Sequence, residues 1–191
     1  MIKRLFDLCL ATFCMLILSP VFIISYLAVK LSSKGPGIFK QERIGLHGKP
    51  FMIYKLRTMV VNEEDEGIPQ LAEANDDRLT KVGAWLRSHH IDELPQLWNV
   101  LKGDMSFVGY RPERQYFINQ ILEIRPDYQE LYAIRPGITS LATIYNGYTN
   151  NMEKMIRRLD MDLDYLRHMS LLNDLRIIGL TVVNILAGKK I

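Results

Sequence analysis

The chain has 191 residues, a length that suits one domain with a small accessory element rather than two full domains. Its 24 basic and 21 acidic side chains leave a net charge of only +3, so the composition does not require nucleic acid as a partner, and we expect none. The two cysteines and four histidines show neither the spacing of a disulfide framework nor that of a zinc site. The adjacent His89 and His90 are interpreted as ordinary polar positions.

The first predicted element is an apolar segment. Residues 8–29 carry no charged side chain, and about 20 apolar residues are enough for a helix to cross a membrane. A secretory signal peptide would start with basic residues, as this chain does at Lys3 and Arg4, but it would also contain a small-residue cleavage site soon after the apolar core. No such site follows, so a membrane anchor is the preferred interpretation.

Two features favour a re-entrant anchor over a straight span. Ser19 and Pro20 lie in the middle of the apolar segment, and proline removes a backbone donor and kinks a helix. Each half of about 10–12 residues would reach roughly 15–18 Å, about half of the hydrocarbon core. Both flanks are basic, which favours the cytoplasmic face for both ends. The flanking basic residues are Lys3, Arg4, Lys30 and Lys34. A spanning helix remains the alternative.

Two strands and a helix are predicted next. Residues 38–44 and 51–56 have the composition of short strands, and residues 45–50 between them contain the Gly and Pro of a turn. Thr80 is expected to cap a helix that ends near Arg87.

More helices are predicted in the second half of the chain. Asp92 is expected to cap a helix that Gly103 ends. The remaining segments are a helix over 112–123, a long functional loop over 135–148, and helices over 151–167 and 171–186. The last helix carries apolar residues at helical spacing, which fits either a membrane surface or ordinary core packing.

The adjacent carboxylates Asp92 and Glu93 are the first candidates for chemistry. Neighbours on a helix point about 100° apart, so the two side chains can take separate roles. One carboxylate oxygen can attack phosphorus, while the other carboxylate holds a divalent cation. The alternative is structural, with Asp92 as an N-cap and Glu93 complementing the helix dipole. Taken alone, the pair favours the structural alternative, because acidic helix starts are common.

Basic residues next to apolar or turn motifs form a second group of candidates. Arg111 and Arg135 each precede a proline, which restricts the backbone and fixes where the arginine points. Guanidinium groups match phosphate oxygens in a bidentate manner, and a pyrophosphate substrate would need several cations. The alternative is ion pairing with surface carboxylates, which contributes little. The candidates are Lys55, Arg57, Arg87, Arg111 and Arg135.

Taken together, these motifs resemble those of the bacterial sugar transferase family, in particular its small monotopic phosphoglycosyl transferases. The resemblance covers nearly the whole chain, and the long block that begins at Asp92 is its most specific part. The matching stretches are Lys3–Asp7, Ser19–Pro20, Phe39–Gly45, Phe51–Met59, Asp92–Gly109, Arg111–Glu113 and Arg135–Thr139.

The resemblance implies that the chain is a phosphotransferase. Asp92 would attack the β-phosphate of a UDP-sugar, so that UMP leaves and a phosphosugar-aspartyl intermediate remains. A polyprenyl phosphate, expected to be undecaprenyl phosphate, would then take the sugar phosphate. Glu93 would bind Mg²⁺. The other implied site residues are Arg111, Lys55, Arg57 and Arg87 at the phosphates, and Asp162 at an acidic family position near the site.

The resemblance also implies a mainly α fold with a small β-hairpin. Residues 1–34 would form a re-entrant membrane anchor, a helix interrupted by a break and continued by a second helix. Residues 35–191 would form a compact cytosolic catalytic domain with amphipathic interfacial helices. The protein would contact lipid in the bacterial inner membrane, with its catalytic domain facing the cytoplasm.

Two departures from the family pattern leave alternatives open. Tyr110 stands where the family commonly has proline, and the stretch 140–148 lacks the basic residue that commonly ends the corresponding family segment. The altered stretch keeps open an inactive member of the family that binds nucleotide sugar. A non-enzymatic membrane adaptor, with a hairpin anchor and amphipathic helices that recruit partners, is the other alternative. The sequence does not specify the sugar.

Overall fold

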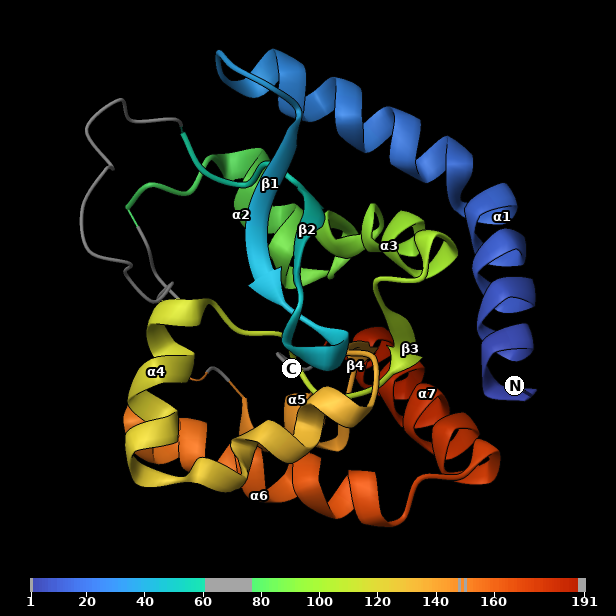
Figure 1. The fold of residues 1–191 in the computed structure, drawn as a ribbon. Coiled ribbons are helices and arrows are strands. Elements are labelled where there is room, and N and C mark those ends of the chain that lie inside the picture. Colours follow the sequence, from blue (N-terminus) through green and yellow to red (C-terminus); the bar gives the residue numbers. More distant parts are fainter. Residues whose placement is uncertain (1, 61–76, 148, 150, 189–191) are drawn as a thin grey trace.

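The computed structural model describes residues 2–60, 77–147, 149 and 151–188. This part of the chain is mainly helical, as predicted (Figure 1). In chain order the helices and strands are α1 (Ile2–Ser32), β1 (Ile38–Ile44), β2 (Pro50–Leu56), α2 (Lys81–Ser88), α3 (Gln96–Lys102), β3 (Ser106–Val108), α4 (Gln115–Ile124), β4 (Gly137–Thr139), α5 (Leu141–Asn146), α6 (Met152–Arg167) and α7 (Leu171–Leu186). Three 3₁₀ segments are η1 (Leu46–Gly48), η2 (Ile91–Glu93) and η3 (Pro126–Ala133).

The predicted hairpin and helix α2 are confirmed. β1 and β2 pair antiparallel, from Ile38 opposite Leu56 to Ile44 opposite Pro50. Thr80 caps α2, because its side-chain oxygen accepts a hydrogen bond of 2.8 Å from the backbone N–H of the third residue along. The two helices predicted over 151–167 and 171–186 are also confirmed, as α6 and α7.

A second, parallel pair of strands is a feature that the sequence did not predict. Ser106 of β3 lies opposite Gly137 of β4, and Val108 lies opposite Thr139. The two strands approach closely, since a Cβ atom added at Gly137 would lie 2.1 Å from the backbone nitrogen of Gly109. Only glycine permits this approach.

Two boundaries in this region differ from the prediction. The long loop expected over 135–148 contains β4 and α5, and Ser140 caps α5 by accepting a hydrogen bond from the backbone N–H of Thr143. Helix α4 starts at Gln115 rather than at residue 112, because the backbone before it is tied to β1: the carbonyl of Glu113 accepts a 3.0 Å hydrogen bond from the last residue of that strand.

Helix α1 is continuous but bent. The helix runs unbroken through Pro20, so the expected interruption is wrong, yet Figure 1 shows a clear bend about halfway along. Proline leaves the carbonyl four residues earlier without its helical donor, and that carbonyl belongs to Leu16. The hydroxyl of Ser19 donates to it at 2.8 Å. Ser19 therefore satisfies the carbonyl that Pro20 leaves without a donor.

Both halves of α1 pack against the same globular unit. In the first half, the buried carboxylate of Asp7 accepts hydrogen bonds from the Ser106 hydroxyl (2.9 Å) and the Phe107 N–H (3.2 Å) on β3. In the second half, Val29 lies in a buried cluster with side chains of β2 and α2. Among the described residues, α1 alone is long and apolar enough to cross a membrane. Exposed apolar residues between the two contacts include Phe13, Leu16, Ile17, Ile23, Ile24 and Leu27.

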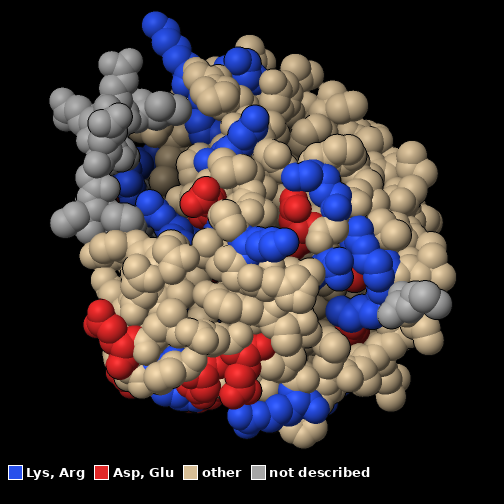
Figure 2. Space-filling view, viewed as in Figure 1, with Lys and Arg blue, Asp and Glu red and all other residues tan. Residues whose placement is uncertain are grey.

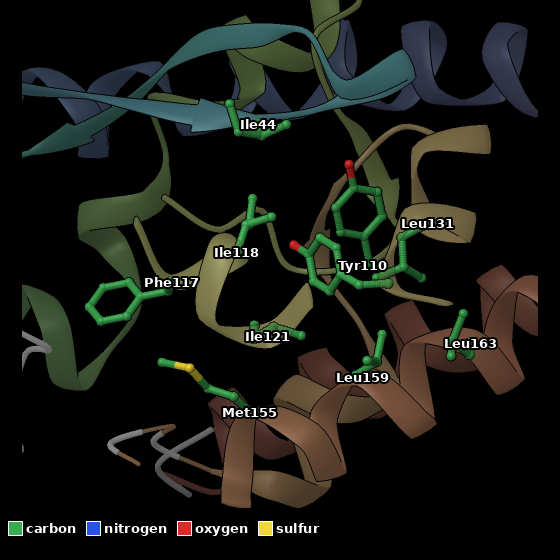
Figure 3. Packing of buried hydrophobic residues seen from close by; sticks show 10 residues of the cluster. Ile44, Tyr110, Phe117, Ile118, Ile121, Leu131, Met155, Leu159 and Leu163 are labelled. Atoms are coloured by element: carbon green, nitrogen blue, oxygen red, sulfur yellow. The ribbon is translucent and has the colours of Figure 1, made fainter. Parts of the chain in front are cut away.

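The largest hydrophobic core lies between the hairpin and helices α4 and α6 (Figure 3). Ile44 of β1 faces this core from above, and Ile118 and Ile121 of α4 fill its centre. Leu159 and Leu163 of α6 close it from the other side. Tyr110, in the segment that follows β3, also lies in this core, so α4 and α6 hold that segment in place.

Candidate active site

The acidic pair lies in η2, a short 3₁₀ segment between α2 and α3, and not at the start of a helix. Helix α3 begins at Gln96, and Pro95 in front of it provides no side-chain cap. Asp92 is nearly buried, and its Oδ1 atom has no hydrogen-bond partner. The interpretation of Asp92 as an N-cap is therefore wrong. Gly103 does end α3, in the left-handed conformation with a φ of 96°.

The environment of Asp92 makes its carboxyl a weaker acid than usual. Burial and the adjacent charge of Glu93 raise its pKa to about 6, although Lys55, Arg87 and Arg111 act in the opposite direction. A carboxylate with a raised pKa is more basic and still mostly ionised at neutral pH. Asp92 therefore combines an unpaired oxygen with the charge that a nucleophile needs.

Glu93 is held by two cations. Lys55 of β2 contacts its Oε1 atom at 2.5 Å, and Arg111, from the segment after β3, approaches the same oxygen at 3.8 Å. Burial would raise the pKa of Glu93, but these two cations outweigh it and lower the pKa to about 2. Glu93 is thus a permanent anion at any physiological pH.

Three separate elements bring their cations to the acidic pair. Lys55 comes from β2, Arg87 from α2 and Arg111 from the segment after β3, and all three act on the Asp92 carboxylate. The face drawn in Figure 2 shows acidic side chains near its centre bordered by basic ones, whereas another acidic group lies along its lower edge. The structure therefore gathers five of the residues that the sequence singled out into one site.

Asp162 lies on α6, close to Arg111 of this site. It is buried, and its Oδ1 atom has no hydrogen-bond partner. Burial raises its pKa to about 7, although the nearby charged and polar groups of Arg158, Arg111 and Ser140 oppose the shift. Asp162 is thus close enough to Arg111 for the two groups to interact, and its role at the site stays a prediction.

Two predicted phosphate ligands have other partners. The buried guanidinium of Arg57 donates to the carbonyls of Lys34 (2.8 Å) and Ser33 (2.7 Å), so it closes the C-terminal end of α1. The Nε atom of Arg135 donates to the carbonyl of Gly103 at the end of α3 (2.8 Å). The structure does not bring either arginine to the acidic pair, because each is committed to backbone carbonyls elsewhere.

His90 is a residue of the site that the sequence interpretation missed. It precedes η2 with a φ of 56°, a conformation that few residues other than glycine adopt. Its Nε2 atom is buried without a partner, and burial lowers its pKa despite the attraction of Glu93. Nothing in the residue pattern indicates a positive φ at His90. Only the structure reveals its left-handed backbone and its buried, unpartnered Nε2 atom.

A buried ion network beside Arg111 was also missed. The two carboxylate oxygens of Glu113 form ion pairs with two arginines: Oε2 with Arg43 of β1 (2.8 Å) and Oε1 with Arg158 of α6 (2.8 Å). Burial opposes ionisation, but both arginines lower the pKa of Glu113. The signal was available, since Glu113 ends one of the matching motifs, but its partners lie far away in the sequence.

The residues that the structure describes can supply one or two carboxylate ligands to a magnesium ion, but not a complete set of protein ligands. The described residues contain no group of three or more His, Cys, Asp or Glu side chains arranged to hold a metal. Mg²⁺ in phosphoryl-transfer sites commonly takes one or two carboxylates and completes its shell with substrate phosphates and water. The permanently ionised Glu93 and the unpaired Oδ1 of Asp92 match that requirement.

Comparison with known proteins gives a consistent result. A family model described as bacterial sugar transferase matches residues 1–188. A UDP-glucose:undecaprenyl-phosphate glucose-1-phosphate transferase of Escherichia coli (strain K12) is 45% identical over 184 residues, which cover 95% of this chain and 39% of that protein. A protein of the same name from Caulobacter vibrioides is 43% identical over 186 residues, covering 96% of this chain and 69% of that protein.

A more distant relative is named for a different sugar. The UDP-N-acetylgalactosamine-undecaprenyl-phosphate N-acetylgalactosaminephosphotransferase of Aeromonas hydrophila is 38% identical over 187 residues, covering 98% of this chain and 44% of that protein. The chain spans about two fifths of the length of the Escherichia coli relative and somewhat more than two thirds of the Caulobacter one. The similarity therefore extends along the whole chain but not along the whole of every relative.

Proposed function

The chain belongs to the bacterial sugar transferase family, and from this premise we propose that it transfers a sugar 1-phosphate from a UDP-sugar to a polyprenyl phosphate. The observation that carries the proposal is the buried Asp92, with its unpaired oxygen, among Lys55, Arg87 and Arg111. Transfer of a phosphoryl group from a diphosphate depends mainly on positive charge and on fixed positioning of the reacting groups. The relatives are named for UDP-glucose or UDP-N-acetylgalactosamine and undecaprenyl phosphate, so these are the substrates to test first.

In the first half of the proposed reaction, Asp92 is the nucleophile. One of its carboxylate oxygens attacks the β-phosphorus of the UDP-sugar, and the bond from that phosphorus to the bridging oxygen breaks, so that UMP leaves. The cations Lys55 and Arg111, which contact Glu93, would neutralise the charge that develops on the phosphates. A phosphosugar-aspartyl intermediate remains on the chain.

In the second half, the acceptor removes the sugar phosphate. An oxygen of the polyprenyl phosphate attacks the same phosphorus, the acyl-phosphate bond to Asp92 breaks, and the carboxylate is restored. Splitting the transfer in this way lets a water-soluble donor and a lipid acceptor use one site in turn. Glu93, with help from the unpaired oxygen of Asp92, would hold Mg²⁺, which supplies charge neutralisation at the diphosphate.

The test is release of UMP from a panel of UDP-sugars, with Asp92→Asn as the matched control. With undecaprenyl phosphate present, we expect continuous release from at least one UDP-sugar. Without acceptor, the covalent route predicts a burst of about one UMP per enzyme, whereas direct transfer predicts none. If no UDP-sugar yields UMP above the Asp92→Asn background, the adaptor or the inactive nucleotide-sugar binder becomes the better description.

We also propose that α1 enters and leaves the membrane by one face. The support is the docking of both halves: Asp7 contacts β3 and Val29 packs with β2 and α2. A straight span would carry one of these contacts to the opposite side of the bilayer. The hydroxyl of Ser19 on the freed carbonyl allows the bend at Pro20 without an unsatisfied group in lipid.

The proposed orientation places the site at the inner face of the bacterial cytoplasmic membrane. The basic ends of α1 favour the cytoplasmic side, and the UDP-sugar donor is a soluble cytoplasmic compound. Helix α7 supports an interfacial position, because Asp174 and Ile177 face the core while Leu172, Val183 and Leu186 on its other side are exposed. Membrane lipid would cover this apolar surface together with the exposed side of α1.

A further inference from the structure

The first two turns of α1 hold strand β3 at two points. Directly, both oxygens of the Asp7 carboxylate accept hydrogen bonds from β3: Oδ2 from the Ser106 hydroxyl (2.9 Å) and Oδ1 from the Phe107 N–H (3.2 Å). Asp7 is 1% exposed. A carboxylate in an otherwise apolar helix is costly to bury and is retained only where its bonds matter, so this contact requires a reason beyond anchoring.

The second contact runs through two other helices. Lys3 contacts Oδ2 of Asp174 on α7 at 2.5 Å, and Tyr165 of α6 donates its hydroxyl to Oδ1 of the same carboxylate at 2.5 Å. The Tyr165 oxygen also lies 3.4 Å from the carbonyl oxygen of Val108, the last residue of β3. Asp174 and Tyr165 are almost completely buried, so this chain of polar contacts is shielded from competing water.

A rigid connection links β3 to Arg111. The N–H of Gly109 donates to the carbonyl of Thr139 (3.1 Å), and the N–H of Gly137 donates to the carbonyl of Tyr110 (2.9 Å). The backbones at Gly109 and Gly137 are in close contact, because neither residue could carry even a Cβ atom. The two segments therefore cannot shift closer together. A shift of β3 is therefore passed on along the backbone to Arg111 rather than absorbed by a flexible turn.

We propose that Asp7 is a positioning residue, through which the membrane helix α1 sets the place of Arg111 in the active site. The contact of Lys3 with Asp174, which also binds Tyr165 beside Val108, connects α1 to the same strand a second time. The inference rests on the proposed function, in which Arg111 contacts the diphosphate, and it gives α1 a role in turnover in addition to its role as an anchor. A catalytic group displaced by about 1 Å can lose up to two orders of magnitude in rate.

Two substitutions at one position separate positioning from anchoring. Asp7→Leu removes both hydrogen bonds while making α1 more apolar, so attachment to the membrane is not weakened. Asp7→Asn keeps an oxygen for the Phe107 N–H and offers an amide donor to the Ser106 oxygen. Thr12→Leu is the matched control: Thr12 is an exposed polar residue of the same helix, bonded only to the helix backbone.

The first measurement is hydrogen–deuterium exchange of the whole chain in lipid nanodiscs. We expect Asp7→Leu to accelerate exchange over residues 106–111, whereas Asp7→Asn and Thr12→Leu leave it unchanged. This readout needs no turnover, so it stays informative even if no UDP-sugar is a substrate, a result that would contradict the proposed function alone. Unchanged exchange over 106–111 in Asp7→Leu would overturn the inference.

The second measurement is a double-mutant cycle on UMP release. Asp7→Leu should lower kcat/KM by about tenfold, and Asp7→Asn should restore most of it. In an Arg111→Lys background, Asp7→Leu should cause little further loss, because both changes act on the same contact. If the two losses multiply instead, Asp7 acts independently of Arg111 and the positioning role is wrong.

Discussion

At the scale of single residues, the candidate site depends on two adjacent carboxylates that differ in their protonation. Burial raises the pKa of Asp92 to about 6, whereas Lys55 and Arg111 overcome burial and lower that of Glu93 to about 2. Environments that push neighbouring carboxyl groups apart in pKa assign them different tasks. The more basic Asp92 suits attack on phosphorus, and the permanent anion Glu93 suits a cation.

Asp92→Asn should abolish UMP release without harming the fold. The amide is not a competent nucleophile. Because the folded-state pKa of Asp92 lies above its usual value of 3.8, the ionised form opposes folding, and this penalty develops as the pH rises from about 4 through 6. The variant should therefore match or exceed the wild-type melting temperature, with a larger margin at pH 8 than at pH 4. Turnover at the wild-type rate would remove Asp92 from the nucleophile role.

Glu93→Gln should weaken the response to magnesium, since an amide oxygen binds a hard divalent cation less well than a carboxylate. The measurement is UMP release during a magnesium titration of both proteins. The lowered pKa of Glu93 means that its charge is kept down to about pH 2, so the magnesium requirement of the wild type should not change with the ionisation of Glu93 between pH 5 and 8. An unchanged titration in the variant would contradict the metal role.

At the scale of elements, local signals were enough to predict several elements: strand composition and turn residues predicted the hairpin, the Thr80 cap predicted α2, and apolar spacing predicted α7. The pair β3 and β4 was missed because each strand has only three residues and the partners lie about 30 residues apart, so no local pattern marks them. Asp92 was misplaced as a cap for a related reason, because an acidic residue before an apolar run looks the same in front of a 3₁₀ turn.

The partners of the candidate cations could not be predicted from local sequence either. Arg57 and Arg111 both stand in matching motifs, yet Arg111 reaches Glu93 and Arg57 closes the end of α1. Residue type and spacing predicted that these cations matter. Which carbonyl or carboxylate each one meets depends on tertiary packing, and the sequence does not contain that information locally.

Arg57→Met should therefore act on stability rather than on substrate binding. The variant removes a buried guanidinium from the carbonyls of Ser33 and Lys34, and the loss of such charge-assisted hydrogen bonds should lower the free energy of unfolding by about 3 kcal/mol. Thermal melting and the KM for the donor are the measurements. Lys81→Met, at an exposed position on α2, is the control. A large rise in KM with an unchanged melting temperature would restore Arg57 to the substrate site.

At the scale of the whole molecule, the anchor and the site form one unit. Helix α1 contacts β3 near its start and β2 and α2 near its end (Figure 1). In the proposed topology, these contacts would keep the acidic pair at a fixed position relative to the bilayer surface. A lipid phosphate lies at the membrane interface, and a soluble nucleotide sugar arrives from the water. An enzyme that joins the two benefits from a site held at that boundary.

The topology of α1 can be tested by cysteine accessibility in intact cells, after Cys9 and Cys14 are replaced by alanine. A unique cysteine at position 2, where Ile2 is exposed, should react with an impermeant reagent only after permeabilisation. Lys81→Cys on α2 marks the side of the globular domain and should behave identically. Labelling of position 2 from outside, with position 81 protected, would show that α1 spans the membrane.

Pro20→Ala tests what holds the bend. The alanine N–H can again bond the Leu16 carbonyl, which Ser19 serves in the wild type, so a straight helix becomes more favourable. A straight span would move Lys3 and Arg4 to the far side against the positive-inside preference and would separate Asp7 from β3. These opposing effects predict a mixed population, with position 2 only partly labelled from outside. Complete protection in Pro20→Ala would mean that docking to the globular domain, rather than the proline, keeps both ends of α1 on the same side.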